Sequence, residues 1–442
     1  MPLNQEPVIN VGILASEIIW FELKGEFKWN ETIIPKGIYK ASSEGSLVCT
    51  QFAQQSRIEL EPAHNESTFI LKKVKIGIGF HWEQEEDQEF QGKLILQSEE
   101  KKIRAINAIG LENYLQSVIS SEMSSMNDLN LLKAHAVVSR SWLLAQIESS
   151  AKKETDCHAS AMASARNDSE IKEVVKWYDR EEHKTFDVCA DDHCQRYQGI
   201  TKVISGDAKQ AVDETRGIVL IYSNEICDAR FSKCCGGITE DFENVWQPVK
   251  IPYLTSIIDN SNPESLLRPA SIENFISSSP EAFCNTNNLE ILSQVLVDFD
   301  QKTTDFFRWT KTYNQNELSE LIELKSGIHF GKIVDLIPLE RGYSGRIINL
   351  KIMGTEQTVV VGKELEIRKW LSKSHLYSSA FIVEKEFGAN SEIPSKFTLK
   401  GAGWGHGVGM CQIGAAAMSQ KGYNFEEILV HYFKSANLNK YY

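Results

Sequence analysis

The 442-residue sequence lacks any run of 18 consecutive apolar residues, so we expect no transmembrane helix. Its first residues, 1–7, contain neither a basic segment nor a long apolar one, and they do not resemble a secretory signal. Long runs of Lys or Arg are also missing. The net charge is −13, and an acidic protein gains nothing from the counterion release that drives nucleic-acid binding. We therefore expect no nucleic-acid partner.

Phosphate-binding motifs are absent as well, because no glycine-rich stretch ends in Gly-Lys-Ser/Thr and none has the Rossmann spacing after a strand. The nine cysteines are an odd number in a long chain, which argues against a full disulfide framework and leaves thiols available for metals. Apolar residues make up 42% and charged residues 24%, as in ordinary globular proteins. The length predicts two or three domains, or one core with large insertions.

Residues 1–109 have the pattern of a β-rich region, with β-branched and aromatic runs separated by Gly and Asn. The pattern then changes, and apolar residues at helical spacing predict helices over 111–121 and 128–147. Strand character returns over 211–228. Residues 331–385 are again β-like, with one short helix near 364–371. We predict an α+β fold, with a β-rich core, helices packed on it and helical insertions.

These patterns divide the chain into four segments. They are a β-rich segment at 1–109, a segment at 110–262 with a polar Cys- and His-containing insertion at 150–196, a helical insertion at 263–330, and a β-rich closing segment at 331–442. The first, second and fourth segments would supply the strands of the core.

The closing segment contains a glycine-rich loop at 401–412 with glycines at alternate positions. Bare backbone of this kind can approach another backbone or a ligand closely. Trp404 and His406 project from it, and an aromatic face beside a polar group suits a sugar ring. A tight turn around a core tryptophan would give the same pattern.

Glu122 follows an apolar helix, where partial desolvation would raise a carboxyl pKa toward the range of a general acid. A solvated glutamate at a helix end is the plainer interpretation. Arg140 ends the apolar stretch of the next helix. It could pair with a carboxylate, grip a polar ligand or simply lie at the surface.

Four residues form a candidate zinc site: His183, Cys189, His193 and Cys194. Two Cys and two His suit tetrahedral zinc, although adjacent ligands are uncommon and free thiols or a disulfide would also fit. Cys157 and His158 could add ligands. The neighbouring Cys234 and Cys235 look more like small buried residues than like a site.

Taken together, four stretches resemble the SpoIID/LytB family of peptidoglycan enzymes. They are the segment around Glu122 (110–123), the helix that follows it (132–141), a Gly-Gly turn leading to Asn-Val-Trp (236–246), and a stretch beginning Gly-Trp-Gly-His-Gly-Val-Gly-Met (403–415). Residues 211–217 also fit. The stretches occur in the family's order, and similarity extends over nearly the whole chain.

The resemblance implies a lytic transglycosylase. Such an enzyme cleaves the bond between N-acetylmuramic acid and N-acetylglucosamine in peptide-stripped glycan and leaves 1,6-anhydro ends. Glu122 would be the single general acid and base, without the carboxylate pair of hydrolytic glycosidases. Glycan strands and an N-acetylmuramoyl-L-alanine amidase would be the partners. The substrate-binding residues would be Arg140, Gly236, Gly237, Trp246, Trp404, His406 and Gln412.

The resemblance also implies that catalysis needs no cofactor and that His183, Cys189, His193 and Cys194 would hold a structural zinc. It implies a location in the periplasm or cell envelope, whereas the missing signal fits the cytoplasm. Phe231 stands where many members have tyrosine, and His135 where they usually have glutamine. A non-catalytic, glycan-binding amidase enhancer is therefore the alternative function. A zinc- or thiol-based protein of unrelated function is the third.

Overall fold

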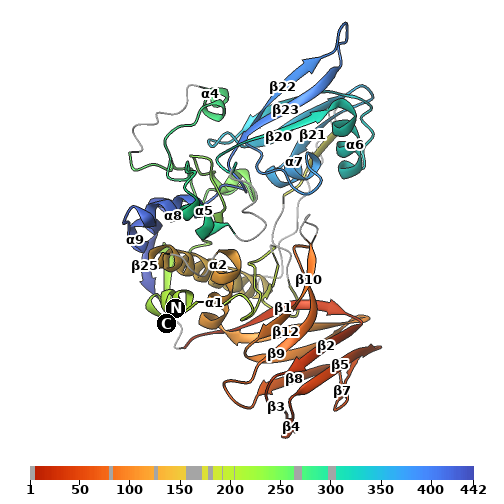
Figure 1. Ribbon diagram of the computed structural model, residues 1–442, viewed down its shortest axis with the longest axis vertical. Helices are drawn as coiled ribbons and strands as arrows, with labels where there is room; N and C mark the ends of the chain where they lie inside the picture. Colours follow the sequence, from red (N-terminus) through yellow and green to blue (C-terminus); the bar gives the residue numbers. More distant parts are fainter. Residues whose placement is uncertain are drawn as a thin grey trace. The chain divides into compact units, whose positions relative to one another are not determined.

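The computed structural model describes residues 5–78, 83–123, 128–155, 172–177, 183–191, 193–203, 205–262, 271–296 and 305–442. The chain forms two compact units, each assembled from separated stretches. Unit 1 comprises Met1–Leu143, Arg180–Val219 and Leu438–Tyr442, and unit 2 comprises Leu144–Asp179 and Leu220–Asn437. Strands and helices occur in both, which confirms the predicted α+β class (Figure 1).

Unit 1 is built on two sheets, with strand orders β14-β1-β12-β11-β8-β3-β4 and β10-β9-β2-β5-β6-β7. The strands are β1 (Val8–Ser16), β2 (Ile18–Leu23), β3 (Phe27–Trp29), β4 (Thr32–Ile34), β5 (Gly37–Glu44), β6 (Leu47–Cys49), β7 (Gln54–Gln55), β8 (Arg57–Pro62), β9 (Phe69–Ile76), β10 (Gln84–Phe90), β11 (Lys93–Glu99), β12 (Lys102–Gly110) and β14 (Val188–Cys189). Alternate residues such as Phe21 and Leu23 of β2 are buried, as the two-residue period of a strand requires. The β-rich character predicted for residues 1–109 is confirmed.

The first helix, α1 (Leu111–Glu122), follows β12 without a loop, and α2 (Leu129–Thr155) comes next. Both were predicted, although α2 is longer than expected. The strand expected over 211–228 is partly wrong, because α3 (Asp207–Glu214) occupies its beginning. Ala208, Ala211 and Val212 are buried at helical spacing, and the apolar face of so short a helix resembles a strand in sequence.

Unit 2 contains several smaller sheets, among them β13-β21-β20-β19, β18-β23-β22 and the pair β17-β24. The remaining strands of the chain are β13 (Lys172–Val175), β15 (Ile218–Tyr222), β16 (Glu225–Ile226), β17 (Phe231–Ser232), β18 (Arg308–Asn314), β19 (Ile333–Arg341), β20 (Ile347–Gly354), β21 (Thr358–Gly362), β22 (Phe381–Phe387), β23 (Pro394–Ala402), β24 (Met410–Cys411) and β25 (Asn437–Lys440). The remaining helices are η1 (Phe242–Asn244), α4 (Ile272–Ser277), α5 (Leu289–Val295), α6 (Gln315–Ser326), α7 (Glu364–Trp370), α8 (Gln412–Gln420) and α9 (Phe425–Tyr432).

Within the segment 263–330, predicted as a helical insertion, the described residues form α4, α5 and α6. They also form β18, which pairs with β23 from Arg308 to Asn314. Its sequence Trp-Thr-Lys-Thr-Tyr is rich in aromatic and β-branched residues, which favours a strand. α6 then begins with a capping box between Asn314 and Glu317 and ends at Gly327 in the left-handed conformation.

A large apolar core holds the β18–β23 region of unit 2 together. Trp309, Leu318, Phe330, Trp370 and Phe381 are among its buried members. Among the residues that the structure describes, no helix is long and apolar enough to cross a membrane.

Candidate functional site

Glu122 is the last residue of α1 and is half-buried, as its place at the end of an apolar helix predicts. Its Oε1 accepts the backbone N–H of Arg196 at 3.0 Å. One carboxylate oxygen is therefore fixed by a backbone donor from a distant stretch of unit 1.

The loop that supplies this donor packs along α1. Gln195 Oε1 accepts the hydroxyl of Tyr114 at 3.2 Å, and the N–H of Gln198 donates to Ser117 Oγ at 3.3 Å. The rings of Tyr114 and Tyr197 stack, with centroids 5.1 Å apart and planes at 18°. The position of Glu122 consequently depends on the order of this loop.

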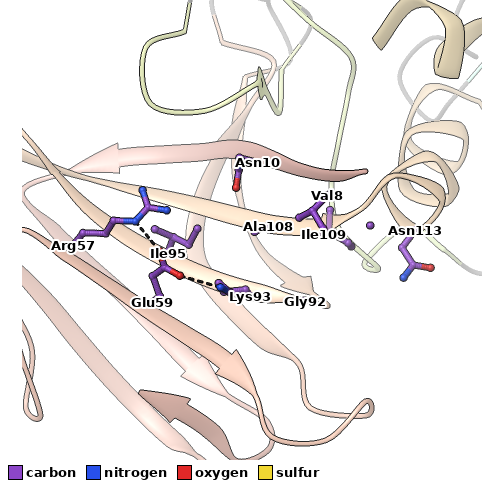
Figure 2. A pocket seen from close by; sticks show the side chains of 11 residues that line it. Val8, Asn10, Arg57, Glu59, Gly92, Lys93, Ile95, Ala108, Ile109 and Asn113 are labelled. Carbon is purple, nitrogen blue, oxygen red and sulfur yellow. Dashed lines mark hydrogen bonds and ion pairs between the residues drawn. The ribbon is translucent and has the colours of Figure 1, made fainter. Parts of the chain in front are cut away.

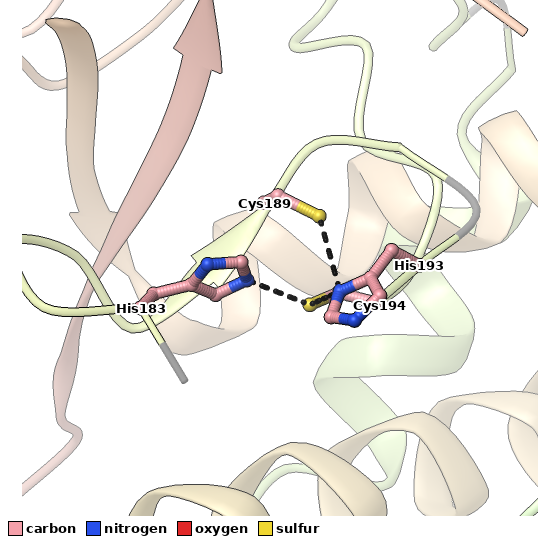
Figure 3. A group of neighbouring side chains, drawn as sticks. All are labelled: His183, Cys189, His193 and Cys194. Carbon is pink, nitrogen blue, oxygen red and sulfur yellow. Dashed lines mark hydrogen bonds between the residues drawn. The ribbon is translucent and has the colours of Figure 1, made fainter. Parts of the chain in front are cut away.

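The same loop begins with the predicted metal ligands. His183, Cys189, His193 and Cys194 point toward one another (Figure 3), and their ligand atoms all lie within 4.8 Å of one another. His183 Nε2 is 3.4 Å from Cys194 Sγ, and His193 Nδ1 is 3.8 Å from Cys189 Sγ. Zinc bonds of about 2.3 Å to sulfur and 2.0–2.1 Å to nitrogen would place tetrahedral S and N ligands about 3.6 Å apart. The donor set therefore fits zinc in both chemistry and spacing.

Hydrogen bonds from Cys194 and from the imidazoles of His183 and His193 hold the pKa of the Cys189 thiol well below its usual range, against the effect of burial. A thiolate is the form that binds metal. Cys157 and His158, the further ligand candidates, lie outside the described residues.

Arg140 is fully buried in unit 1, and its guanidinium forms a two-pronged ion pair with Glu112 of α1. Nε lies 3.1 Å from Oε1, and Nη2 lies 2.6 Å from Oε2. Nη1 donates to the carbonyl of Ile218 at 3.0 Å, while Glu112 also accepts the N–H of Gly217 and the hydroxyl of Tyr442. Of the three roles considered for Arg140, the structure shows the pairing with a carboxylate. Contact with a substrate would require this pair to open.

The glycine-rich loop lies in unit 2, where its alternate glycines do what their spacing predicts. Gly403, Gly405, Gly407 and Gly409 all have positive φ, between 75° and 92°. β24, which follows, pairs in parallel with β17, placing Met410 beside Phe231. A Cβ on Gly403 would stand 2.8 Å from the carbonyl of Cys234, so close backbone approach requires glycine there.

Two aromatic groups flank this loop. Trp404 stacks on Phe306 with centroids 4.6 Å apart and planes at 8°, and Tyr377 meets it edge-on. His406 packs edge-to-face against Trp246 at 4.6 Å. The two tryptophans and His406 are all half-buried, so each residue keeps some exposed surface.

The imidazole of His406 is held in one tautomer. Its Nδ1 accepts the N–H of Val408 at 3.0 Å, and the ring also hydrogen-bonds the backbone of Phe231. Burial, together with the guanidinium groups of Arg230 and Arg346, holds the pKa of His406 well below its usual range. His406 is therefore neutral at pH 7, with its ring orientation fixed.

The other predicted substrate-binding residues are buried. Gly236, Gly237 and Gln412 shape the backbone beneath the loop and present little surface. Sequence reasoning missed Arg230, whose guanidinium lies 4.0 Å over the ring of Trp246 and pairs with Asp228. The only sequence signal for Arg230 was its position directly before Phe231, where the chain departs from the family pattern.

A cavity of about 460 Å³ lies elsewhere in unit 1, over β1, β8, β11 and β12 (Figure 2). Arg57, Glu59 and Lys93 line its polar side, and Asn113 stands at its end. Asn113 is in the first turn of α1, about 14 Å along the helix from Glu122 at 1.5 Å per residue. This cavity therefore lies at the opposite end of the helix from the candidate acid.

Comparison with known proteins finds a family that resembles part of this chain. Residues 99–222 match the family model described as stage II sporulation protein, a range that contains Glu122, Arg140 and the four candidate zinc ligands. Over these residues the chain is similar to the SpoIID/LytB family. Residues 240–409, which contain most of the glycine-rich loop, match a domain of unknown function.

Three curated proteins are similar to this chain. An uncharacterized protein of Brachyspira hyodysenteriae is 25% identical over 353 residues, which cover 80% of this chain and 73% of the relative. Stage II sporulation protein D of Bacillus subtilis is 25% identical over 76% of each chain. The amidase enhancer of Bacillus subtilis is 24% identical over 54% of this chain and only 33% of its own length. These similarities support a cell-wall-related function.

Proposed function

We propose that the protein is a lytic transglycosylase acting on peptide-stripped peptidoglycan glycan, with Glu122 as its single general acid and base. Protonated Glu122 gives its proton to the leaving glycosidic oxygen. The carboxylate then accepts the proton of the muramic C6 hydroxyl, whose oxygen attacks C1 and closes the 1,6-anhydro ring. The observation that supports this role is a half-buried carboxylate, held by the Arg196 N–H, at the end of α1 within the matched family region.

The arrangement of carboxylates on α1 supports a one-carboxylate mechanism. Glu112 is on the same helix, but ten residues at 1.5 Å per residue separate it from Glu122 by about 15 Å. Paired catalytic carboxylates of hydrolytic glycosidases lie about 5–9.5 Å apart. Glu112 is also committed to its ion pair with Arg140. It therefore does not serve as the second carboxylate.

Sugar binding is assigned to Trp246, Trp404 and His406, which are half-buried in unit 2. An amidase that removes stem peptides would act before this enzyme, and the cell envelope would be the site of action.

Products from peptide-free glycan strands, analysed by mass spectrometry, test the activity. Wild-type protein should release fragments with 1,6-anhydromuramic ends, and Glu122→Gln should lower the rate by at least about 100-fold, the usual contribution of a general acid or base. Glu85→Gln makes the same chemical change at an exposed position of β10 and should keep wild-type activity. Equal product from wild type and Glu122→Gln would refute the assignment.

One observation favours the second candidate function, a non-catalytic amidase enhancer. Phe231 stands at the position of the family tyrosine, and its ring cannot donate a hydrogen bond to a sugar. In this case the protein would bind glycan and stimulate an amidase without forming anhydro ends. The same assay, repeated with an amidase and intact peptidoglycan, separates the two functions.

The His183–Cys189–His193–Cys194 cluster would hold a structural zinc that orders the loop behind Glu122, and the metal would take no part in the reaction. We expect His183→Asn with Cys189→Ser to lower the zinc content by about one ion per chain, lower the unfolding midpoint and reduce glycan cleavage. Unchanged zinc content would contradict this site. If Glu122→Gln keeps the activity and chelation abolishes it, the result would instead favour a zinc- or thiol-based function.

A further inference from the structure

A second group of metal-ligating side chains lies in unit 2, distinct from the candidate zinc ligands of unit 1. The thiols of Cys235, Cys284 and Cys411 and the carboxylate of Asp259 are all buried, and their ligand atoms all lie within 4.8 Å of one another. The thiol of Cys234 also contacts those of Cys284 and Cys411. Sequence reasoning treated Cys234 and Cys235 as small buried residues. Both residues are buried, and they also contact two cysteines from distant stretches of the chain.

The sulfur atoms are spaced for one shared ion. Cys235 Sγ and Cys284 Sγ are 3.5 Å apart. Sulfurs around a tetrahedral zinc, at about 2.3 Å from the metal, lie about 3.8 Å apart. Each thiol has more than one thiol neighbour. A disulfide joins sulfurs in exclusive pairs at about 2.05 Å, so this convergence fits a single ion better.

The backbone around the cluster donates to sulfur. Cys411 Sγ accepts the N–H of Cys235 at 3.2 Å and that of Gly414 at 3.4 Å, and Cys235 Sγ accepts the N–H of Gly237 at 3.4 Å. Hydrogen bonds to the charged form of a ligand stabilise it, and metal-bound sulfur is a thiolate. Three backbone donors therefore already point at the atoms that would carry negative charge.

Asp259 is tied into the same centre. Its Oδ2 lies 3.4 Å from Cys235 Sγ and accepts the N–H of Cys284 at 3.3 Å, while Oδ1 accepts the hydroxyl of Tyr432 at 2.7 Å. His431 Nε2 is 3.4 Å from Oδ1. These hydrogen bonds orient the Asp259 carboxylate. They would do so whether Asp259 binds the metal itself or hydrogen-bonds to a residue that binds it.

We propose that this cluster is a second structural metal site that binds zinc through the thiolates of Cys235, Cys284 and Cys411, with Cys234 or Asp259 as the fourth ligand. Soft thiolates select zinc over hard cations, and the short sulfur spacing suits one ion rather than an iron–sulfur cluster. The metal would join the Gly236-Gly237 turn to the start of α8, where Cys411 is the N-cap residue. It would thereby fix the base of the glycine-rich loop.

Metal analysis of the full chain tests the site independently of glycan cleavage. Wild type should contain about two zinc ions per chain, and the His183→Asn/Cys189→Ser variant about one. Adding Cys284→Ser to that variant should remove the remaining ion. Adding Cys227→Ser should not, because Cys227 is a buried cysteine of unit 2 outside the cluster. No zinc in the His183→Asn/Cys189→Ser variant would overturn the proposal.

A measurement on protein with intact cluster residues covers the case in which Cys284→Ser fails to fold. The His183→Asn/Cys189→Ser variant, loaded with Co²⁺, should show the visible bands of a tetrahedral ion and sulfur-to-metal charge transfer. Cys234→Ser weakens the charge transfer if Cys234 is the fourth ligand, whereas Asp259→Asn shifts the visible bands if Asp259 is. The proposal would be overturned if the Co²⁺-loaded variant showed neither the visible bands nor the charge transfer.

Thiol counting separates the metal from its alternatives. Denatured wild-type protein with chelator should expose all nine cysteines to a thiol reagent. A shortfall of two or four thiols, with a mass lower by two hydrogen atoms for each pair, would show disulfides and overturn the proposal. Nine thiols without bound metal in the folded protein would leave only a buried thiol cluster and overturn it as well.

Discussion

Arg140 shows what sequence reasoning can and cannot resolve for a single residue. Its place at the end of an apolar stretch left three roles open: a carboxylate pair, a polar ligand or a position at the surface. The partner, Glu112, lies 28 residues away, and a further hydrogen bond to the same carboxylate comes from the hydroxyl of Tyr442. No local pattern indicates pairings over such distances, so the choice between ligand and ion pair required the structure.

Removing only one member of the Arg140–Glu112 ion pair should lower the stability of the protein. Arg140→Met leaves the Glu112 carboxylate buried without a counter-charge, and we expect unfolding in urea to show a loss of about 3–5 kcal/mol. Adding Glu112→Gln removes the buried charge while keeping an acceptor for Gly217, so the double variant should be more stable than Arg140→Met alone.

An exposed ion pair supplies the control. Lys209→Met, which breaks the surface pair with Asp213 on α3, should cost less than about 1 kcal/mol. If Arg140→Met costs no more than Lys209→Met, the buried pair does not hold unit 1 together.

Among the elements, the long periodic helices were predictable, and so was the short helix expected near 364–371, which is α7, whereas the short α3 was not. The apolar spacing of α1 and α2 extends over several turns, whereas α3 has eight residues and presents only a few buried positions. The alternate glycines of 401–412 predicted close backbone approach. The neighbour that they approach, residues 230–236, lies about 170 positions earlier and follows from the fold alone.

The glycine-rich loop should be intolerant of side chains at its alternate positions. A Cβ at Gly409 would overlap the carbonyl of Arg230, and its φ of 75° costs a non-glycine residue about 1–2 kcal/mol by itself. We expect Gly409→Ala to destabilise unit 2 by about 2 kcal/mol or more in a denaturant titration.

Gly388 is the matched position, because a Cβ there meets nothing within 4 Å and its φ is not in the left-handed region. Gly388→Ala should change stability by less than about 0.5 kcal/mol. Similar losses for the two variants would show that the loop is not held against residues 230–236.

At the scale of the whole molecule, composition predicts several segments, but it does not predict how stretches of the chain are divided between the two units. The sequence divides into four consecutive segments, and that division stays a prediction. The two units each combine separated stretches, and unit 1 includes the last residues of the chain. A shift in composition marks where a pattern changes, but it does not reveal that the chain leaves a unit and later returns.

Two units with separate cores should unfold in two calorimetric transitions. Arg140→Met should lower the midpoint of one transition, and Gly409→Ala that of the other, since each substitution lies in a different unit. A single transition that both variants shift alike would mean that the units unfold cooperatively as one.

The cysteine cluster of unit 2 has a consequence for biosynthesis. Its residues are made in the order Cys234, Cys235, Asp259, Cys284 and Cys411, and a long stretch of chain separates Cys284 from Cys411. The ribosome therefore supplies the Cys411 thiol well after the other three, so an emerging chain cannot close the site before that stretch has been made. Metal would be acquired in the compartment where all of these segments fold together, and the zinc content would report on that compartment.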